Sequence, residues 1–153
     1  MTRRLLFTLV MCAFAAAAQD KASFAGTWKL NASKSDYGPM PAPDKLISKI
    51  AHEDPKLEVA SEVSNQQGEF TTNSKYTTDG KECTNTNRGF EIKSTVKWDG
   101  AALMFESRGN FNGNDVTFKD KWMLGADGKT MTIARHITAP QGELDQTQVF
   151  EKQ

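Results

Sequence analysis

Apolar and polar residues alternate along most of this chain, in short segments separated by turn residues about every eight to twelve positions. A period of two places successive side chains on opposite faces of a strand, so the alternation predicts β-structure. The segments that carry the pattern are 26–31, 45–52, 56–63, 69–77, 81–88, 91–98, 101–109, 116–124, 131–137 and 144–150.

The clearest hairpin is centred on Asp99-Gly100, a dipeptide that favours a tight two-residue turn. Apolar side chains then fall on one face of both flanking strands, while lysine and threonine side chains fall on the other. The pairs that this turn predicts on the inner face are Trp98 with Ala101, Val96 with Leu103, and Ser94 with Phe105.

A long antiparallel meander leaves two open sheet edges unless the sheet closes on itself. We therefore predict an all-β fold, a single antiparallel up-and-down β-barrel of about eight to ten strands. Segment 32–44 follows the first strand and contains Pro39, Pro41 and Pro43, which exclude a regular helix or a central strand there. This proline-rich loop either crosses one end of the barrel or forms a solvated connection.

Residues 1–18 have a different pattern. A short basic segment precedes an apolar run over residues 5–18, which closes on three alanines. These features are typical of a secretory signal peptide, and the run is shorter than the roughly 20 apolar residues that a membrane-spanning helix needs. We predict cleavage after Ala18, a mature barrel domain over 19–153, and a periplasmic or secreted location. The alternatives are a buried N-terminal helix and lipidation at Cys12.

The charge and cysteine content limit the classes of partner that we expect. The chain has 19 basic and 19 acidic residues and no basic stripe, which argues against a nucleic acid or an anionic membrane as partner. We expect a monomer without a membrane-spanning segment after cleavage. Removal of Cys12 would leave Cys83 as the single cysteine, either as a buried thiol, which we favour, or as a bridge between two chains.

Both ends of the predicted barrel carry a family resemblance. Segment 24–30 (FAGTWKL) resembles the opening of the cellular fatty-acid-binding proteins and shares its Gly-x-Trp with lipocalins, and segment 147–152 (TQVFEK) resembles the closing strand of the fatty-acid-binding family. The chain as a whole is similar to small exported bacterial lipocalin-like proteins. The resemblance implies a calycin barrel in which Gly26 begins the first strand and Trp28 packs across the bottom.

The chain also departs from the fatty-acid-binding family. Segment 32–44 is too short and too rich in proline for the two helices of that family. Its closing Arg-x-Tyr pair, which grips a carboxylate, is replaced here by Gln148 and Phe150. A fatty-acid carboxylate site is therefore not carried over to these positions.

A polar cluster interrupts the apolar inner face of the last three strands. Asp120 lies between Phe118 and Trp122, and Arg135 lies within the next inner face. The predicted pairing places Arg135 opposite Gln146, near Gln148, with Asp120 diagonally across from it. Our hypothesis is that Arg135 orients a polar ligand head while Asp120 holds the guanidinium. The alternatives are a self-satisfied ion pair in a packed core and a bulge that turns these residues outward.

The hairpin around Asp79-Gly80 is more polar than the rest. Thr72, Ser74, Asn85 and Asn87 share one of its faces. Such a hairpin either lines a hydrated barrel interior or forms a flap over the barrel mouth.

The residues favour a binding protein over an enzyme. His52 and His136 lie in different segments without metal-site spacing, and no nucleophile or phosphate-loop motif is present. We predict no catalytic residues, no metal and no cofactor. We expect a small apolar or amphipathic ligand inside the barrel, in contact with Arg135, Asp120 and the residues around them. The full predicted set is Arg135, Asp120, Gln146, Gln148, Phe150, Trp122, Phe118 and Phe105. The alternative is a non-enzymatic envelope or extracellular interaction or inhibitor protein with a packed core.

Overall fold

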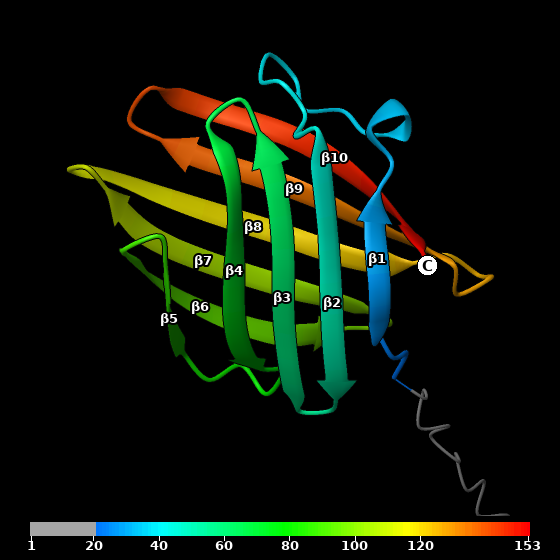
Figure 1. The fold of residues 1–153 in the computed structure, drawn as a ribbon. Coiled ribbons are helices and arrows are strands. Elements are labelled where there is room, and N and C mark those ends of the chain that lie inside the picture. The colour runs from blue at the N-terminus through cyan, green and yellow to red at the C-terminus, as the bar shows by residue number, and fades with distance from the viewer. Residues whose placement is uncertain (1–20) are drawn as a thin grey trace, which may run out of the picture.

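Ten antiparallel strands form one sheet in the computed structural model, which describes residues 21–153 (Figure 1). The predicted signal peptide and the possible lipidation at Cys12 lie outside the described residues. The strands are β1 (Gly26–Leu30), β2 (Lys45–Glu53), β3 (Lys56–Asn65), β4 (Gly68–Thr77), β5 (Cys83–Asn87), β6 (Phe90–Asp99), β7 (Ala102–Phe111), β8 (Asn114–Leu124), β9 (Thr130–Ala139) and β10 (Gly142–Lys152). The one helical element between Lys21 and Gln153 is the 3-10 turn η1 (Ala32–Lys34).

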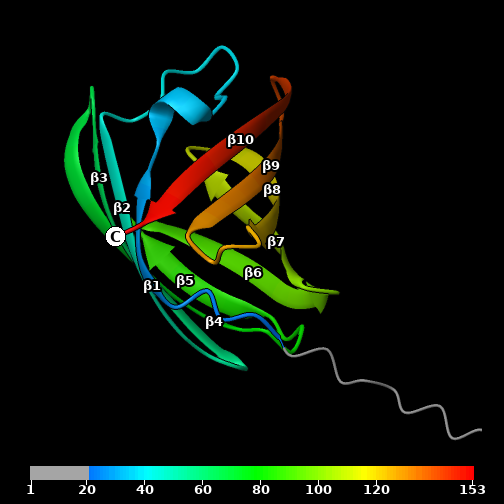
Figure 2. The same cartoon turned by 90° about the vertical axis from the view of Figure 1, so that its right-hand side faces the viewer.

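The sheet curves round into a nearly closed barrel (Figure 2). Its strand order is β4-β3-β2-β1-β10-β9-β8-β7-β6-β5. Strands that follow each other in the sequence are therefore paired, except β4 and β5, which are the two edges of the sheet, and β1 also pairs with β10. This confirms the predicted all-β, antiparallel up-and-down barrel, and its ten strands fall within the predicted range.

The predicted register of the β6–β7 hairpin is wrong by two residues. Val96 faces Phe105 and Trp98 faces Leu103, because Asp99 still pairs with Ala102 and the turn lies at Gly100-Ala101. Gly100 has a φ of 60° and is the first residue of this turn, whereas the prediction made it the second. A slip of two keeps every side chain on its predicted face, and the inner face is therefore unchanged.

The barrel is closed at the end where the chain enters. Trp28 and Phe24 are fully buried there, and the Trp28 indole Nε1 donates a hydrogen bond to the Phe24 carbonyl at 2.9 Å. At the start of β1, Gly26 has a φ of 137°, and a Cβ at this position would lie 2.6 Å from the Lys152 Cε. The Lys152 ammonium in turn lies 5.3 Å from the centre of the Trp28 ring. Trp28 is thus packed against the Phe24 backbone and the Lys152 side chain at this end of the barrel.

Side chains rather than a backbone ladder join β4 to β5. The Asn85 amide accepts a hydrogen bond from the Lys75 N–H at 2.8 Å and donates one to the Lys75 carbonyl at 3.0 Å. Asn87 donates to the Ser74 hydroxyl at 2.9 Å. We call this junction the β4–β5 seam. Strand β5 is therefore part of the barrel wall, and not a flap over the mouth.

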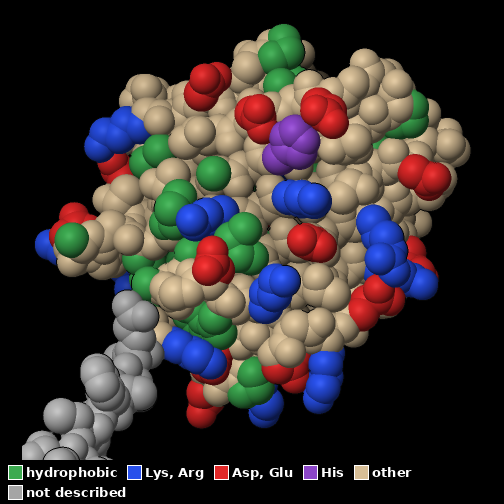
Figure 3. Space-filling view, turned by 180° about the vertical axis from the view of Figure 1, so that it is seen from behind, with side chains coloured by type: hydrophobic (Ala, Val, Ile, Leu, Met, Phe, Trp, Pro, Cys, Tyr) green, Lys and Arg blue, Asp and Glu red, His purple; other side chains and the backbone are tan. Residues whose placement is uncertain are grey.

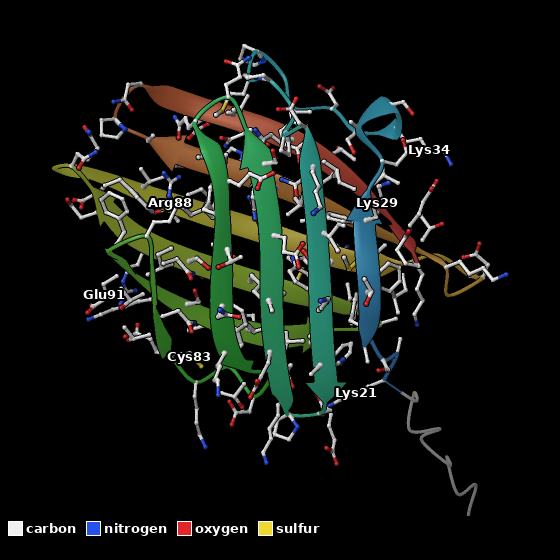
Figure 4. The ribbon with its side chains drawn as sticks, in the orientation of Figure 1. Lys21, Lys29, Lys34, Cys83, Arg88 and Glu91 are labelled. Carbon is white, nitrogen blue, oxygen red and sulfur yellow. The ribbon has the colours of Figure 1, made fainter. Side chains whose placement is uncertain are left out.

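Two labelled side chains mark the ends of β5 in Figure 4. Arg88, just after β5, lies with its guanidinium 4.2 Å from the centre of the Phe70 ring on β4. Cys83, at the other end, is half-buried rather than buried as we favoured, with its Sγ 3.7 Å from the Lys81 carbonyl. It is the single cysteine among residues 21–153, so this part of the chain contains no internal disulfide.

Basic and acidic side chains are interspersed on the face shown in Figure 3, where neither sign forms a continuous area. Among residues 21–153, no helix has the length and apolar character needed to cross a membrane.

Candidate functional site

A cavity of about 730 Å³ occupies the barrel interior. It extends toward the end formed by the proline-rich loop and the β3–β4 turn, whose residues Met40 to Pro43 and Asn65 to Gln67 contribute to its wall. Alternation along each strand aims every second side chain inward, which explains why one face of each strand supplies the lining. The volume lies within the roughly 300–1,000 Å³ that is typical of small-molecule sites.

All eight predicted ligand-binding residues contribute to the wall of this one cavity. They come from β7, β8, β9 and β10, which are neighbours in the sheet. The set is Phe105, Phe118, Asp120, Trp122, Arg135, Gln146, Gln148 and Phe150. Whether a ligand contacts them stays a prediction.

Arg135 and Asp120 form a two-bond ion pair in the cavity wall. The Arg135 Nε donates to Asp120 Oδ1 at 2.9 Å and Nη2 donates to Oδ2 at 2.6 Å. The predicted diagonal placement is wrong, since the two residues are directly opposite each other across β8 and β9. The Asp120 side chain is only 8% exposed, whereas the Arg135 side chain is 30% exposed.

The charges of Arg135 and Asp120 balance each other. Burial alone would lower the pKa of Arg135, but the neighbouring Asp120 carboxylate outweighs it and raises the pKa above its ordinary value. Arg135 therefore stays charged, and its charge is balanced at contact distance. The guanidinium also lies 5.6 Å from the centre of the Phe118 ring, which adds a favourable cation–π contact.

Two glutamines flank the ion pair. Gln146 is directly opposite Arg135 as predicted, and Gln148 lies opposite Ile133. Both are buried. The Gln146 amide nitrogen lies 3.8 Å from the Met40 sulfur, a weak acceptor, and the Gln148 amide has no hydrogen-bond partner among residues 21–153. Both amides are therefore available to a polar group in the cavity.

Aromatic rings form the wall nearer the closed end. Phe105 and Trp122 stack at 4.4 Å between ring centres, and Tyr76 meets Phe105 edge-on at 5.3 Å. Tyr76 belongs to the predicted strand segment 69–77 but was not among the predicted site residues. Burial raises the pKa of its hydroxyl, so Tyr76 is a neutral hydrogen-bonding group at physiological pH.

Sequence reasoning also missed Tyr37, which the proline-rich loop contributes to the cavity wall. Its hydroxyl is buried and has no hydrogen-bond partner in the described part of the chain. Burial raises the pKa of Tyr37 to about 12, although the Arg135 charge acts in the opposite direction. The loop has no periodic pattern, so no signal in the sequence indicated which of its side chains faces inward.

The other polar groups of the wall mostly satisfy one another. Ser48 and Ser61 are hydrogen-bonded at 2.8 Å, and Ser107 is hydrogen-bonded to Ser94 at the same distance. These pairs let hydroxyl groups lie in an apolar wall at little cost. The cavity wall is therefore mostly apolar, with its two charged residues, Arg135 and Asp120, paired with each other.

Neither histidine belongs to the cavity wall. His52 lies at the closed end of the barrel, and His136 lies on the outside with its Nδ1 2.7 Å from an Asp145 carboxylate oxygen. Within residues 21–153, no group of three or more His, Cys, Asp or Glu side chains is arranged to hold a metal ion.

Comparison with known proteins shows which solved structures have a similar fold. No family model and no curated protein matches the sequence. Among solved structures, the zebrafish ileal bile acid-binding protein complexed with cholic acid is similar at a TM-score of 0.61 and 17% identity, over 85% of this chain and 98% of that chain.

Two further solved structures show the same likeness. A secretory abundant heat soluble protein from Ramazzottius varieornatus matches at a TM-score of 0.60 and 14% identity, over 85% of this chain and 95% of that one. The Schistosoma mansoni fatty acid binding protein in complex with arachidonic acid matches at a TM-score of 0.52 and 14% identity, over 85% of this chain and 96% of that one. The expected resemblance to calycin barrels of the fatty-acid-binding type is thereby confirmed at the level of the fold.

Proposed function

We propose that this protein is a non-enzymatic carrier that binds one small apolar or amphipathic molecule inside its barrel. The observation that carries the proposal is the cavity of about 730 Å³, whose wall is mostly apolar and has its two charged residues, Arg135 and Asp120, side by side. An apolar enclosure with a few converging polar groups is the usual form of a small-molecule site, because burial of the ligand supplies affinity and the polar groups fix its orientation.

The comparisons support this proposal. The zebrafish protein was solved in complex with cholic acid and the Schistosoma mansoni protein in complex with arachidonic acid, and both are similar to this chain in fold. The alternative function, an interaction or inhibitor protein, requires a packed core. An interior cavity of this size favours the carrier over that alternative.

Export is a second part of the proposal. We infer cleavage of residues 1–18 as a signal peptide and a periplasmic or secreted location, from the basic start, the apolar run and the three alanines of that segment. The proposed carrier acts as a monomer and does not bind nucleic acid. The balanced and interspersed surface charge supports this part of the proposal (Figure 3).

Titration of the mature protein with Nile red, a neutral apolar dye, tests the carrier function. We expect saturable fluorescence enhancement at one dye per chain, and loss of it in an Ile137→Trp variant. Ile137 is a lining residue, so an indole at this position would fill part of the cavity. Thr138→Trp is the matched control, because Thr138 is its exposed neighbour on β9.

The proposal predicts that only the inward substitution blocks the dye. Equal loss in both variants, or no saturable binding to the folded wild type, would contradict it. Native mass spectrometry of the protein purified from its own host then identifies any molecule that remains bound.

A further inference from the structure

The cavity wall carries no net charge. Of the residues that line it, Arg135 and Asp120 are the two charged ones, and they are bound to each other through two hydrogen bonds. The hydroxyls of Tyr37 and Tyr76 stay neutral because burial raises the pKa of both. A charged ligand would therefore find no uncompensated opposite charge in this wall.

A carboxylate is poorly matched to such a site. Entering the cavity, it would give up its hydration, which is costly for an ion unless a counter-charge replaces the water. The guanidinium could attract it, but the Asp120 carboxylate beside the guanidinium would repel it. With the ligand carboxylate bound, two negative charges would lie beside one positive charge, and the cavity would hold a net negative charge.

A neutral hydrogen-bond acceptor is well matched. A guanidinium has five N–H donors, and Arg135 uses two of them on Asp120. The side chain is 30% exposed, so part of the fork is accessible to a ligand. Gln148 adds an amide without a partner in the described chain, and the Gln146 amide has only the weakly accepting Met40 sulfur.

We propose that the cavity selects amphipathic molecules whose polar head is uncharged and accepts hydrogen bonds, such as an alcohol, ketone, ester or amide, over molecules that end in a free carboxylate. This inference rests on the proposed carrier function and specifies its ligand class. The Arg135–Asp120 pair then acts as a neutral, preorganised donor group, in which Asp120 fixes the guanidinium and cancels its charge.

Displacement of Nile red by two ligands of equal chain length, 1-dodecanol and dodecanoic acid, tests the inference at neutral pH. The readout is the ratio of their affinities, compared between variants, because the ionised acid is more soluble in water than the alcohol whatever the protein does. We expect the wild type to favour the alcohol by tenfold or more. Asp120→Asn leaves Arg135 as an unbalanced cation, so the ratio should move at least tenfold toward the acid.

Asp115→Asn is the matched control, since Asp115 is an exposed carboxylate on the same strand, β8. It should leave the ratio at the wild-type value. Gln148→Arg provides a second test that keeps the ion pair intact: an added cation in the same wall should also move the ratio at least tenfold toward the acid. This variant decides the question if Asp120→Asn does not fold.

The outcomes separate the two proposals. A wild type that binds the dye but prefers the acid overturns the neutral-head inference and leaves the carrier function standing. So does a ratio that stays unchanged in the folded variants. A folded wild type that binds neither the dye nor either ligand overturns the carrier function, and this inference with it.

Discussion

At the residue scale, Asp54 holds three separate parts of the closed end together. Its carboxylate accepts hydrogen bonds from the Thr78 hydroxyl, from the Trp98 indole at 2.8 Å and from the Lys21 ammonium at 3.0 Å. Burial would raise the pKa of Asp54, but these bonds outweigh it and lower the pKa to about 2. The folded state thus favours the ionised carboxylate.

We predict that Asp54→Ala lowers the free energy of unfolding by roughly 1–3 kcal/mol at pH 7, because it leaves several donors without their acceptor. A depressed folded pKa stabilises the protein above the ordinary value of 3.8, and this stabilisation is lost as the pH falls toward 2. The difference between wild type and variant in urea unfolding should therefore shrink over that range. Asp44→Ala, at an exposed aspartate of the proline-rich loop, should change stability little at either pH.

His52, at the same end, predicts a second pH dependence. The ring is buried, and its Nδ1 accepts a hydrogen bond from the Phe24 N–H at 3.1 Å, so the neutral form is required. Burial lowers the pKa of His52, with Asp54 opposing in part. For a base with a lowered folded pKa, stability is full above the ordinary value of 6.5 and declines as the pH falls below it.

Replacement of His52 by Asn keeps an acceptor near the Phe24 N–H but removes the titrating group. We expect this variant to lose the decline in stability that the wild type shows between pH 7.5 and 5.5, measured by urea unfolding at each pH. His136→Asn is the control, since His136 lies on the outside of the barrel. The assignment to His52 is wrong if the decline persists in the first variant and disappears in the control.

At the scale of elements, sequence alternation located every strand because it depends only on which face is buried. Segment 45–52, for example, is the strand Lys45–Glu53. Pairing depends on turns as well, and here the sequence succeeded only in part. The short turn before Gly142 allowed the pairing of Arg135 with Gln146 to be predicted correctly. The connection between β8 and β9 is longer, and the predicted diagonal position of Asp120 relative to Arg135 was wrong, since the two residues are directly opposite each other.

The same limit explains which residues of the site could be predicted from the sequence. Strand residues such as Phe105 and Gln148 could be assigned to the cavity because side chains alternate between the two faces of a strand. Tyr37 could not, because its orientation is set by a loop that contacts β10 through paired bonds between Asp36 and Thr147. Contacts of this kind, between residues far apart in the sequence, leave no local pattern.

Two of the hydrogen bonds of the β4–β5 seam come from one side chain, Asn85. We predict that Asn85→Ala, which removes both hydrogen bonds to the Lys75 backbone, speeds hydrogen exchange of the Lys75 amide by tenfold or more. Amides in the ladder between β7 and β8 should keep their protection, because their bonds are backbone to backbone. Thr86→Ala, at the exposed neighbour of Asn85, is the control. Unchanged exchange at Lys75 would mean that the seam does not depend on Asn85.

At the scale of the whole molecule, closure depends on a residue outside the sheet. Phe24 precedes β1, yet its ring lies about 6 Å from the ring centres of His52, Trp98 and Trp122, which belong to β2, β6 and β8. Its backbone adds bonds to His52 and to Trp28. One side chain thus connects both halves of the barrel. The proposed cleavage after Ala18 would leave Phe24 in the mature protein.

We therefore predict that Phe24→Ala lowers the free energy of unfolding of the mature chain by about 3–5 kcal/mol, the usual cost of removing a fully buried phenylalanine ring. Met40→Ala is the control, since Met40 is 52% exposed and its loss should cost less than about 0.5 kcal/mol. Nile red affinity measured at low temperature, where both variants are folded, should change little in Phe24→Ala, because Phe24 is not among the cavity-lining residues. A cost for Phe24→Ala no larger than that for Met40→Ala would mean that the barrel is held closed by its strands alone.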